Sequence, residues 1–407
     1  MEQFCASAPG KILWLGGYSV LERGNAAYVA SIDKRAYAQA SLLEGNALEI
    51  KAPQFGIDLF GTIRNGKPSF KSVPRKKLES ARFLVAAVSI SLKYLHSKGG
   101  GKAHGFRLIA VNDPVFGRAG FKTGLGSSSA VTVAAIGAVL GLNGCDPSYE
   151  KCKVVAHNLS QLAHSQAQGK IGSGFDVASG VFGPISYSRP SRDAIQKAGK
   201  SAGKRFAEVV EKAWDYKIAF LAPPKEFAIA LAFTGKPSST TRMIAKLNAF
   251  KARRKSTYSE MVREIDGANV MAIGSLERIL ALRNKDLEEY MLEMRRGHGP
   301  GEAFKAAFEE ARLLTKKLGE LAGAEIENAS MTRLIHSTMQ NGAYVCRLPG
   351  AGGGDSVAAI CLSENEARRV RNYWKSLKLE VLDVSLGNEG VRREAPLAFE
   401  GMLKRWL

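Results

Sequence analysis

The segment "KTGLGSSSAVTVAAIGAVLGL", residues 122–142, constrains the fold more than any other part of the chain. Its second half is apolar on nearly every side, which is typical of a buried helix. Its first half is rich in glycine and serine, so the backbone can approach a ligand and offer N–H and hydroxyl donors. Because the N-terminus of a helix carries partial positive charge, this segment predicts a phosphate-binding loop. A structural turn before a buried helix is the alternative.

The loop matches neither of two common phosphate-binding motifs. It lacks the G-x-x-x-x-G-K-[ST] frame of the P-loop. It also lacks the third glycine and the later acidic residue of the dinucleotide-binding fingerprint. The kind of molecule that carries the phosphate therefore stays open at this point.

The chain is strongly basic, with 58 Lys and Arg against 38 Asp and Glu and a formal net charge of +20. Such a surplus favours anionic partners, either nucleic acid or phosphorylated small molecules. The basic runs at residues 197–205 and 251–255 contain none of the aromatic residues that single-strand-binding surfaces use. We therefore expect these runs to form solvated loops and helix faces, and we expect no nucleic-acid partner.

Neither a membrane span nor a cysteine metal centre is expected. No stretch approaches the roughly 18 uninterrupted apolar residues of a membrane helix, and the first residues lack a basic-then-apolar signal pattern. The cysteines are odd in number and lack metal-ligand spacing, so we expect reduced thiols in a cytoplasmic protein. They are Cys5, Cys145, Cys152, Cys346 and Cys361.

The irregular order of strands and helices predicts an α+β fold with two domains. Residues 77–97 predict an amphipathic helix, and residues 378–386 predict a final strand. Two prolines within residues 220–226 separate strand-like runs and mark a boundary. We therefore expect an N-terminal domain of residues 1–222 and a C-terminal domain of residues 223–407.

Three further glycine-bounded segments contain residues that suit a ligand site. Lys11 stands in an apolar strand between "PG" and "GG", where it is either a snorkelling surface lysine or a point charge for phosphoryl oxygens. Asp176 lies in "GKIGSGFDVASG", where a helix N-cap is the simpler interpretation. Residues 349–356, "PGAGGGDS", contain three consecutive glycines, which a plain surface turn does not need.

Taken in order, these four segments resemble the GHMP kinase superfamily of galacto-, homoserine, mevalonate and phosphomevalonate kinases. That superfamily has an N-terminal P-G-K strand, a G-L-G-S-S-A phosphate loop and a C-terminal G-A-G-G loop. The resemblance runs from about Ala8 to Ile360. It implies an N-terminal domain like ribosomal protein S5 domain 2, a C-terminal ferredoxin-like domain, and an active site in the cleft between them.

Within the superfamily, the flanking residues are similar to the phosphomevalonate kinase pattern. The chain has "GGYSVL" at residues 16–21, where mevalonate kinases carry G-E-H, and it has "FTGKPSSTTRMI" at residues 233–244. The resemblance implies transfer of a phosphoryl group from ATP to mevalonate 5-phosphate with Mg²⁺, by a monomer or homodimer without a membrane partner. The alternatives are mevalonate kinase, mevalonate 3-phosphate 5-kinase, a sugar kinase, a diphosphate decarboxylase, a non-catalytic phosphate-binding protein and, on the +20 charge alone, a nucleic-acid-binding protein.

The resemblance also assigns roles to residues. Lys11 and Asp176 are the expected catalytic pair, and Asp176 is expected to orient Lys11 or the metal, because a phosphate acceptor is already mostly a dianion. Ser128 (Ser127 if the register slips by one) and Asp176 are the expected magnesium ligands, because Ser165 stands where mevalonate kinases carry a glutamate. The expected nucleotide-binding residues are Lys122, Gly124, Leu125, Gly126, Ser127, Ser128 and Ser129. The expected acceptor-binding residues are Tyr18, Ser19, Gly172, Ser173, Ser239, Thr240, Arg242, Gly352, Gly353, Gly354 and Asp355.

Overall fold

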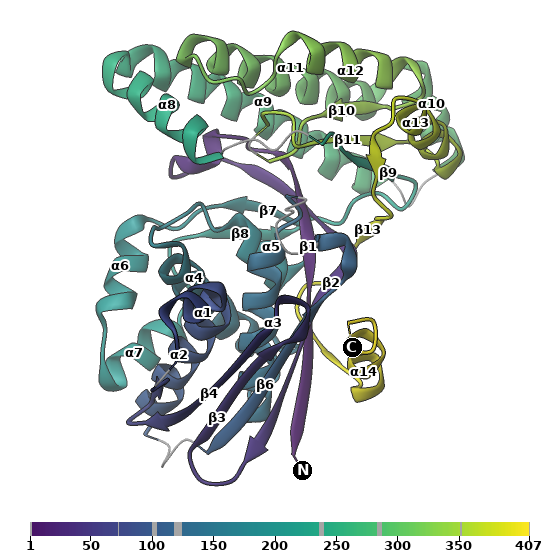
Figure 1. Ribbon diagram of the computed structural model, residues 1–407. Helices are drawn as coiled ribbons and strands as arrows, with labels where there is room; N and C mark the ends of the chain where they lie inside the picture. The colour runs from purple at the N-terminus through teal and green to yellow at the C-terminus, as the bar shows by residue number, and fades with distance from the viewer. Residues whose placement is uncertain are drawn as a thin grey trace.

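Two lobes lie one above the other in the computed structural model (Figure 1). Two long antiparallel strands, β1 (Gln3–Leu15) and β2 (Ala27–Leu43), belong to the lower lobe and extend to the upper one (Figure 1). The short 3₁₀ helix η1 (Ser19–Leu21) lies in the connection between them. The structure describes residues 2–71, 73–99, 104–117, 124–235, 240–282, 287–350 and 352–406.

The lower lobe is built on a sheet of ten strands. The pairs along it are antiparallel except for β3 with β6 among the described strands. Its main path runs β14 (Arg392–Glu394), β1, β2, β6 (Gly105–Asn112), β3 (Ala47–Ala52), β4 (Ile57–Arg64) and β5 (Lys67–Ser69). Three short strands extend it: β7 (Ile185–Ser188) and β13 (Leu386–Gly387) pair with β2, and β8 (Lys217–Phe220) pairs with β7.

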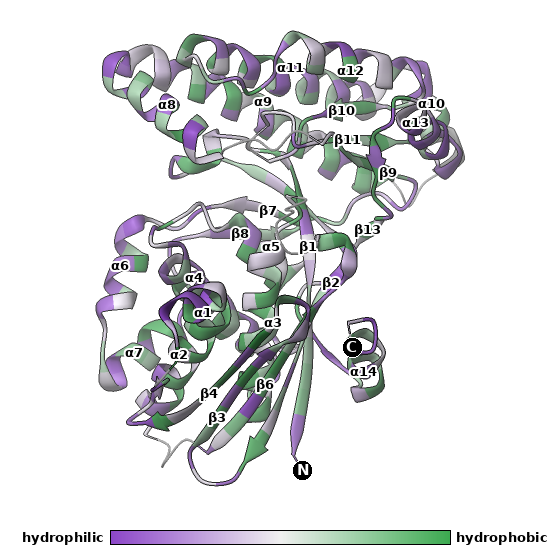
Figure 2. Cartoon of the chain, viewed as in Figure 1, coloured by the Kyte–Doolittle hydropathy of each residue, from purple (hydrophilic) through white to green (hydrophobic). Residues whose placement is uncertain are grey.

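Helix α3 (Ser127–Leu142) is the central helix of this lobe. It contacts β1 and β2 on one side and α2 (Arg82–Ser97) and α4 (Glu150–Gln168) on the other, so nearly all of its side chains are buried. This explains why its sequence is apolar all round, as its colour in Figure 2 shows. The helix expected at residues 77–97 is divided at Ala81 into α1 (Arg75–Ser80) and α2. The remaining helices of the lobe are α5 (Phe175–Phe182), α6 (Arg192–Lys200) and α7 (Gly203–Val210).

The end of the chain returns to the lower lobe. Strand β14 pairs with β1 and β13 pairs with β2. Helix α14 (Pro396–Leu403) covers the sheet face opposite α3, where Phe399 packs with Cys5 and Val111. The proposed division into residues 1–222 and 223–407 therefore leaves these last elements apart from the sheet on which they lie. The strand expected at residues 378–386 is shorter than predicted, because β12 (Glu380–Val381) pairs with β9 (Ala228–Phe233) and Leu386 already belongs to β13 beside β2.

The upper lobe contains a second, smaller sheet with helices packed against it. Its four-stranded antiparallel sheet has the order β10 (Val345–Arg347), β11 (Ser356–Cys361), β9 (Ala228–Phe233) and β12. Ile335 of α12 (Ala329–Gln340) and Trp374 of α13 (Glu364–Ser376) pack in one cluster with alternate residues of these strands. Residues of α9 (Lys255–Leu282) and α11 (Gly299–Ala322) pack in another with Leu231. Helices α8 (Thr240–Arg253) and α10 (Leu287–Arg296) complete the lobe.

The cysteines differ from the expectation. Cys145, which follows α3, is joined in a disulfide to Cys152 in the first turns of α4, and their Cα atoms lie 5.7 Å apart. The prediction that all five thiols are reduced is therefore wrong. Cys5, Cys346 and Cys361 are free and buried.

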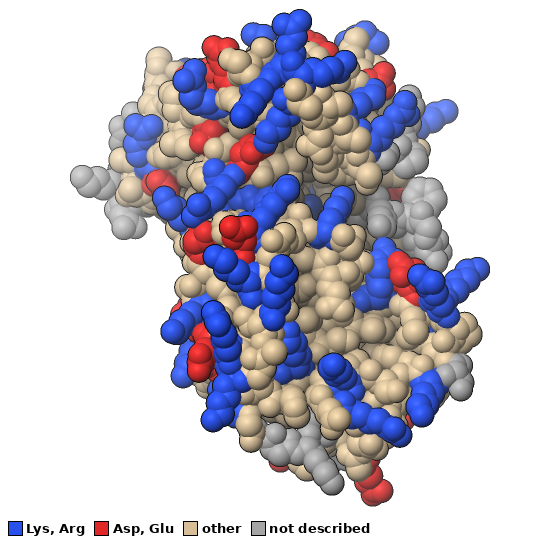
Figure 3. Space-filling view, turned by 90° about the vertical axis from the view of Figure 1, so that its left-hand side faces the viewer, with Lys and Arg blue, Asp and Glu red and all other residues tan. Residues whose placement is uncertain are grey.

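The basic surplus lies on the surface of both lobes. Figure 3 shows Lys and Arg side chains spread over one whole face, with fewer Asp and Glu among them. Within the described part of the chain, no helix has both the length and the apolar character that crossing a membrane requires.

Candidate active site

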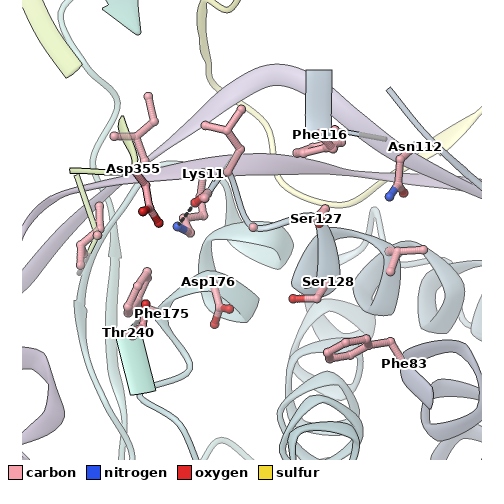
Figure 4. Close-up of a pocket in the computed structure, with 18 of the residues that line it drawn as sticks. Lys11, Phe83, Asn112, Phe116, Ser127, Ser128, Phe175, Asp176, Thr240 and Asp355 are labelled. Atoms are coloured by element: carbon pink, nitrogen blue, oxygen red, sulfur yellow. Dashed lines mark hydrogen bonds between the residues drawn. The ribbon is translucent and has the colours of Figure 1, made fainter. Parts of the chain in front are cut away.

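A cavity of about 680 Å³ lies where the two lobes meet. The lower lobe contributes β1, the start of α3 and the start of α5, and the upper lobe contributes Thr240 and Asp355. Figure 4 shows Ser127 and Ser128 near the middle, with Lys11, Asp355 and Thr240 on one side. Phe83 and Asn112 lie on the other side, and Phe116 lies above Ser127 in this view (Figure 4). The cavity therefore has a charged part and an aromatic part that meet at the N-terminus of α3.

The phosphate loop is held directly against β1. The backbone N–H of Lys11 donates to the carbonyl of Leu125 at 2.9 Å. A Cβ atom on Gly10 would lie 2.9 Å from that carbonyl oxygen and 2.6 Å from the ring of Phe116. Only glycine at position 10 therefore allows this approach, which explains the P-G-K spacing in physical terms.

The loop ends in a geometry that exposes the start of α3 to the cavity. Gly126 is the N-cap residue with φ of 82°, a left-handed conformation that glycine adopts without strain. The first N–H groups of a helix have no partner within the helix, so those of Ser127, Ser128 and Ser129 suit an anion. The hydroxyl of Ser129 donates to the carbonyl of Gly126 at 2.8 Å, so it braces the loop from within.

Lys11 is a buried cation at the edge of this loop. Its side chain is only 7% exposed, and Nζ donates to the carbonyl of Gly124 at 2.8 Å. Nζ also lies 5.4 Å from the centre of the Phe175 ring. Burial lowers the pKa of Lys11 from its usual value, and the charge of Asp176 opposes this effect. A bound polyanion would add to the effect of Asp176 and stabilise the charged ammonium.

Asp176 lies in the first turn of α5, and contacts from two other elements hold this turn. Gln161 of α4 donates to the carbonyl of Gly174 at 2.8 Å, and the hydroxyl of Tyr187 on β7 donates to the carbonyl of Ser173 at 2.7 Å. The Asp176 carboxylate accepts from the N–H of Val177 at 3.0 Å and stays partly open to the cavity. These contacts fix Asp176 in place while its carboxylate stays available to a ligand in the cavity.

His164 of α4 is a site residue that sequence reasoning missed. It is buried beneath the loop, with Nε2 lying 3.2 Å from Ser128 Oγ, 3.3 Å from Gln168 Nε2 and 3.9 Å from Asp176 Oδ2. Its ring also packs against that of Phe83, with the ring centres 5.3 Å apart and the planes tilted by 31°. One imidazole thus lies against both Ser128 and Asp176. The sequence signal was weak, because a histidine within an amphipathic helix reads as an ordinary core residue.

The donor set fits a magnesium ion. Ser128 and Asp176 present a hydroxyl and a carboxylate to one cavity, and Mg²⁺ prefers such oxygen ligands together with phosphates and water. Across the described ranges, no group of three or more His, Cys, Asp or Glu residues suits a metal ion. The protein therefore offers few ligands of its own, and the rest would come from nucleotide phosphate and water.

The structure brings most of the expected site residues together. Those that line the cavity are Lys11, Tyr18, Gly124, Leu125, Gly126, Ser127, Ser128, Ser173, Asp176, Thr240, Gly352 and Asp355. Those that do not line it are Ser19, Ser129, Gly172, Arg242, Gly353 and Gly354. Lys122 and Ser239 lie outside the described residues.

Three of the residues away from the cavity wall have clear structural roles. Ser19 is buried, donates to the carbonyl of Gly16 at 2.7 Å and accepts from Asn269 at 3.1 Å. The N–H of Gly353 donates to the carbonyl of Ile326 at 2.8 Å, and the carbonyl of Gly354 accepts a hydrogen bond from the Thr234 hydroxyl. We expect Ser19 and Gly354 to stabilise the fold and not to contact the acceptor directly.

Comparison with known proteins places this geometry in a family. Residues 84–184 match the GHMP kinases N terminal domain, and residues 280–378 match the GHMP kinases C terminal family. The chain is 30% identical over 395 residues to a phosphomevalonate kinase of Saccharolobus solfataricus, covering 96% of this chain and 98% of that one. It is 25% identical over 450 residues to a phosphomevalonate kinase of Candida albicans, covering 97% and 99%.

Solved structures share the fold. A phosphomevalonate kinase of Streptococcus pneumoniae, in complex with phosphomevalonate and AMPPNP, superimposes with a TM-score of 0.69 at 19% identity, covering 95% of this chain and all of that one. The Lin0012 protein of Listeria innocua superimposes with a TM-score of 0.77 at 22% identity, covering 97% and 99%. The expected α+β fold with its GHMP kinase architecture is therefore confirmed, and the chain belongs to the phosphomevalonate kinase family of the GHMP kinases.

Proposed function

We propose that this protein transfers the γ-phosphoryl group of ATP to the 5-phosphate of mevalonate 5-phosphate, giving mevalonate 5-diphosphate and ADP. The observation that carries the proposal is the position of Lys11, a buried cation bonded to the phosphate loop in the same cavity as Asp176. Family membership supports the reaction class, because the two relatives compared above, which match along nearly the whole chain, are phosphomevalonate kinases.

The main barrier to this reaction is electrostatic, because donor and acceptor are both polyanions. The N–H groups at the start of α3 would cradle the donor phosphates and need no rearrangement, since the helix already orients them. Lys11 would lie beside the transferring group and stabilise the negative charge that both reactants bring. The basic surface would also raise the local concentration of such anions.

Ser128 and Asp176 are the residues that would hold the magnesium ion. When bound, the ion would neutralise charge on the donor phosphates. His164 would keep the Ser128 hydroxyl in place, since its Nε2 lies 3.2 Å from Ser128 Oγ, and it packs 3.9 Å from Asp176 Oδ2. His164 is thus a positioning residue in this proposal and does not contact either substrate.

The acceptor determines what Asp176 has to do. An alcohol acceptor must lose a proton, so a positioned carboxylate base would accelerate its reaction roughly 10²–10⁴-fold. A phosphate monoester has a second pKa of about 6 and is already mostly a dianion at neutral pH. We therefore propose that Asp176 orients Lys11 and the metal and is not a required base.

The acceptor would lie on the charged side of the cavity. Ser173, Thr240 and Tyr18 line that side, and Gly352 and Asp355 belong to the glycine-rich loop that borders it. Arg242 and Ser239 stay candidates for the acceptor phosphate or the hydroxyacid carboxylate, and Lys122 stays a candidate for neutralising donor phosphate. We also propose a cytoplasmic location, where ATP is available, and a monomeric or homodimeric state.

A coupled assay of ADP release tests the proposal. Mg-ATP would be offered with mevalonate 5-phosphate, mevalonate, mevalonate 3-phosphate or galactose in separate reactions. Turnover on mevalonate 5-phosphate alone would support the proposed acceptor. Turnover only on an alcohol would keep the kinase fold but reject that acceptor and make Asp176 a general base. Absence of turnover on all four would favour a non-catalytic phosphate-binding protein.

A further inference from the structure

A buried arginine bonds the two lobes to each other near the cavity. Arg347 is the last residue of β10 in the upper lobe, and it is only 5% exposed. Its Nη1 atom donates to the carbonyl of Trp14 on β1. Its guanidinium carbon lies 5.4 Å from the centre of the Phe308 ring on α11. The phosphotransfer mechanism proposed above gives this cation no task.

Arg347 and Trp14 belong to two segments that form the charged side of the cavity. Lys11 lies three residues before Trp14 on the same strand. The glycine-rich loop follows Arg347 along the chain and contributes Gly352 and Asp355 to the cavity. Figure 4 shows Lys11 and Asp355 on the same side. The hydrogen bond from Arg347 therefore links the strand of the catalytic lysine to the loop that borders the same part of the site.

The middle of this loop is fixed to the upper lobe with the help of a second buried arginine. The N–H of Gly353 donates to the carbonyl of Ile326 at 2.8 Å, and a Cβ atom on Gly352 would lie 2.6 Å from that oxygen. The next residue, Glu327, forms an ion pair with Arg312 of α11, and both side chains are buried. Because the loop is attached to the upper lobe in this way, its distance from β1 depends on how the two lobes are joined.

Stability alone does not explain a cation at position 347. Burial lowers the pKa of Arg347 to about 10, so the guanidinium is still charged at neutral pH, in a place where charge is costly. Its Nε atom is buried and has no hydrogen-bond partner among the described residues. A well-packed apolar side chain often replaces a buried charged group without loss of stability. What the guanidinium adds is a directed bond between the lobes.

We propose that Arg347 is a positioning residue for phosphoryl transfer, which holds the glycine-rich loop at a fixed distance from Lys11 by bonding to the strand of that lysine. The inference rests on the proposed function and deepens it, because Arg347 does not itself line the cavity. Reacting atoms have to lie about 3–3.5 Å apart, and a misplacement of about 1 Å can cost on the order of 10²-fold in rate. Loss of the bond should therefore slow transfer to the acceptor. ATP binding should persist, because the phosphate loop and α3 belong to the lower lobe.

The test compares Arg347→Met with Arg347→Lys in the full-length protein. Methionine removes the charge and the donor, whereas lysine keeps a charged donor on a long side chain. For Arg347→Met we expect kcat/KM for mevalonate 5-phosphate to fall roughly 10- to 100-fold. The Kd of ATP, measured by calorimetry without an acceptor, should stay close to that of the wild type. Arg347→Lys should recover most of the lost kcat/KM, because it can still donate to the Trp14 carbonyl.

Arg35→Met is the matched control, because Arg35 is another buried arginine that donates to backbone carbonyls. It is 6% exposed, and its Nη2 atom donates to the carbonyls of Ser7 and Gly390, where the end of the chain returns to the first sheet. The control should keep the wild-type kcat/KM and the wild-type Kd of ATP. Thermal unfolding of each variant checks its fold.

The same kcat/KM in folded Arg347→Met and Arg35→Met would overturn the inference and leave the kinase proposal in place. Equal losses of acceptor turnover and ATP affinity in Arg347→Met would also overturn it, because they would show a general disturbance of the site. If Arg347→Met did not fold, Arg347→Gln would repeat the measurement with a neutral polar side chain. Failure of both to fold would make Arg347 a stability residue and would again overturn the inference. If the wild-type protein released no ADP with mevalonate 5-phosphate, the proposed function itself would fail, and this inference with it.

Discussion

Replacing Lys11 should harm catalysis more than replacing Asp176. Lys11→Met keeps the length of the side chain but removes a cation that is only 7% exposed and is bonded to the phosphate loop. Water therefore cannot easily take its place. Loss of one such preorganised donor typically costs roughly 10²–10³ in kcat, or about 3–4 kcal/mol.

Asp176→Asn should cost less. The substitution keeps the shape of the side chain and an oxygen that can accept from Val177, but it removes the charge that favours protonated Lys11. With a phosphate acceptor no proton has to be removed, so the loss should stay below the roughly 10²-fold that marks a required base. Because Asp176 acts partly through Lys11 and partly through the metal in this proposal, the loss in the double variant should be smaller than the product of the two single losses.

Steady-state kcat and KM for ATP and for mevalonate 5-phosphate, measured on both single variants and the double variant, would check this. Thermal unfolding of each variant controls for loss of fold. A larger loss in Asp176→Asn than in Lys11→Met would refute the reasoning. The reasoning would also be refuted if the losses of the two single variants added fully in the double variant and a limb of the pH–rate profile disappeared in Asp176→Asn.

Three further predictions follow from single residues. His157 is fully buried and burial lowers its pKa to about 3, so its contribution to stability is complete above its usual pKa of 6.5 and is lost as the pH falls toward 3. The free energy of unfolding, measured with denaturant, should be roughly 2 kcal/mol lower at about pH 5 than at neutral pH because of this residue. His157→Gln should remove this part of the pH dependence, and a variant with the same pH dependence as the wild type would contradict the argument. Gly126→Ala places a Cβ at positive φ and 3.1 Å from Lys11 Cγ, so we expect nucleotide affinity measured by calorimetry to fall about tenfold, whereas wild-type affinity would argue against the loop geometry. His164→Asn removes the imidazole contact with Ser128, and we expect a 10- to 100-fold lower kcat/KM at roughly constant thermal stability. A kcat/KM equal to that of the wild type would show that His164 contributes only to packing.

The central loop and its helix could be predicted because their signals are local. Glycine and serine before an apolar run indicate an anion site whatever surrounds them, and the helix predicted from that run is α3, with Gly126 as its N-cap. The order of the four glycine-bounded segments could also be read from the sequence. Their proximity in the fold could not, because Lys11 contacts Gly124 only through the packing of β1 against the loop.

The features that the sequence did not reveal depend on contacts between distant segments. Strands β13 and β14 are two and three residues long, too short to show a periodic pattern, yet they return the end of the chain to the first sheet. Ser19 looked like a ligand-binding residue, but its partner is Asn269 in the other lobe. His164 has a polar side chain with no motif around it, so only its surroundings in the folded chain mark it as a site residue.

The most direct test of the central claim is the ³¹P NMR spectrum of the product formed from ATP and mevalonate 5-phosphate. A phosphate acceptor requires that the monoester resonance of the substrate be replaced by the coupled pair of resonances of a diphosphate, and this is the result we predict. A second, uncoupled monoester resonance would show that a hydroxyl had been phosphorylated, which would contradict the proposed acceptor and the role given to Asp176.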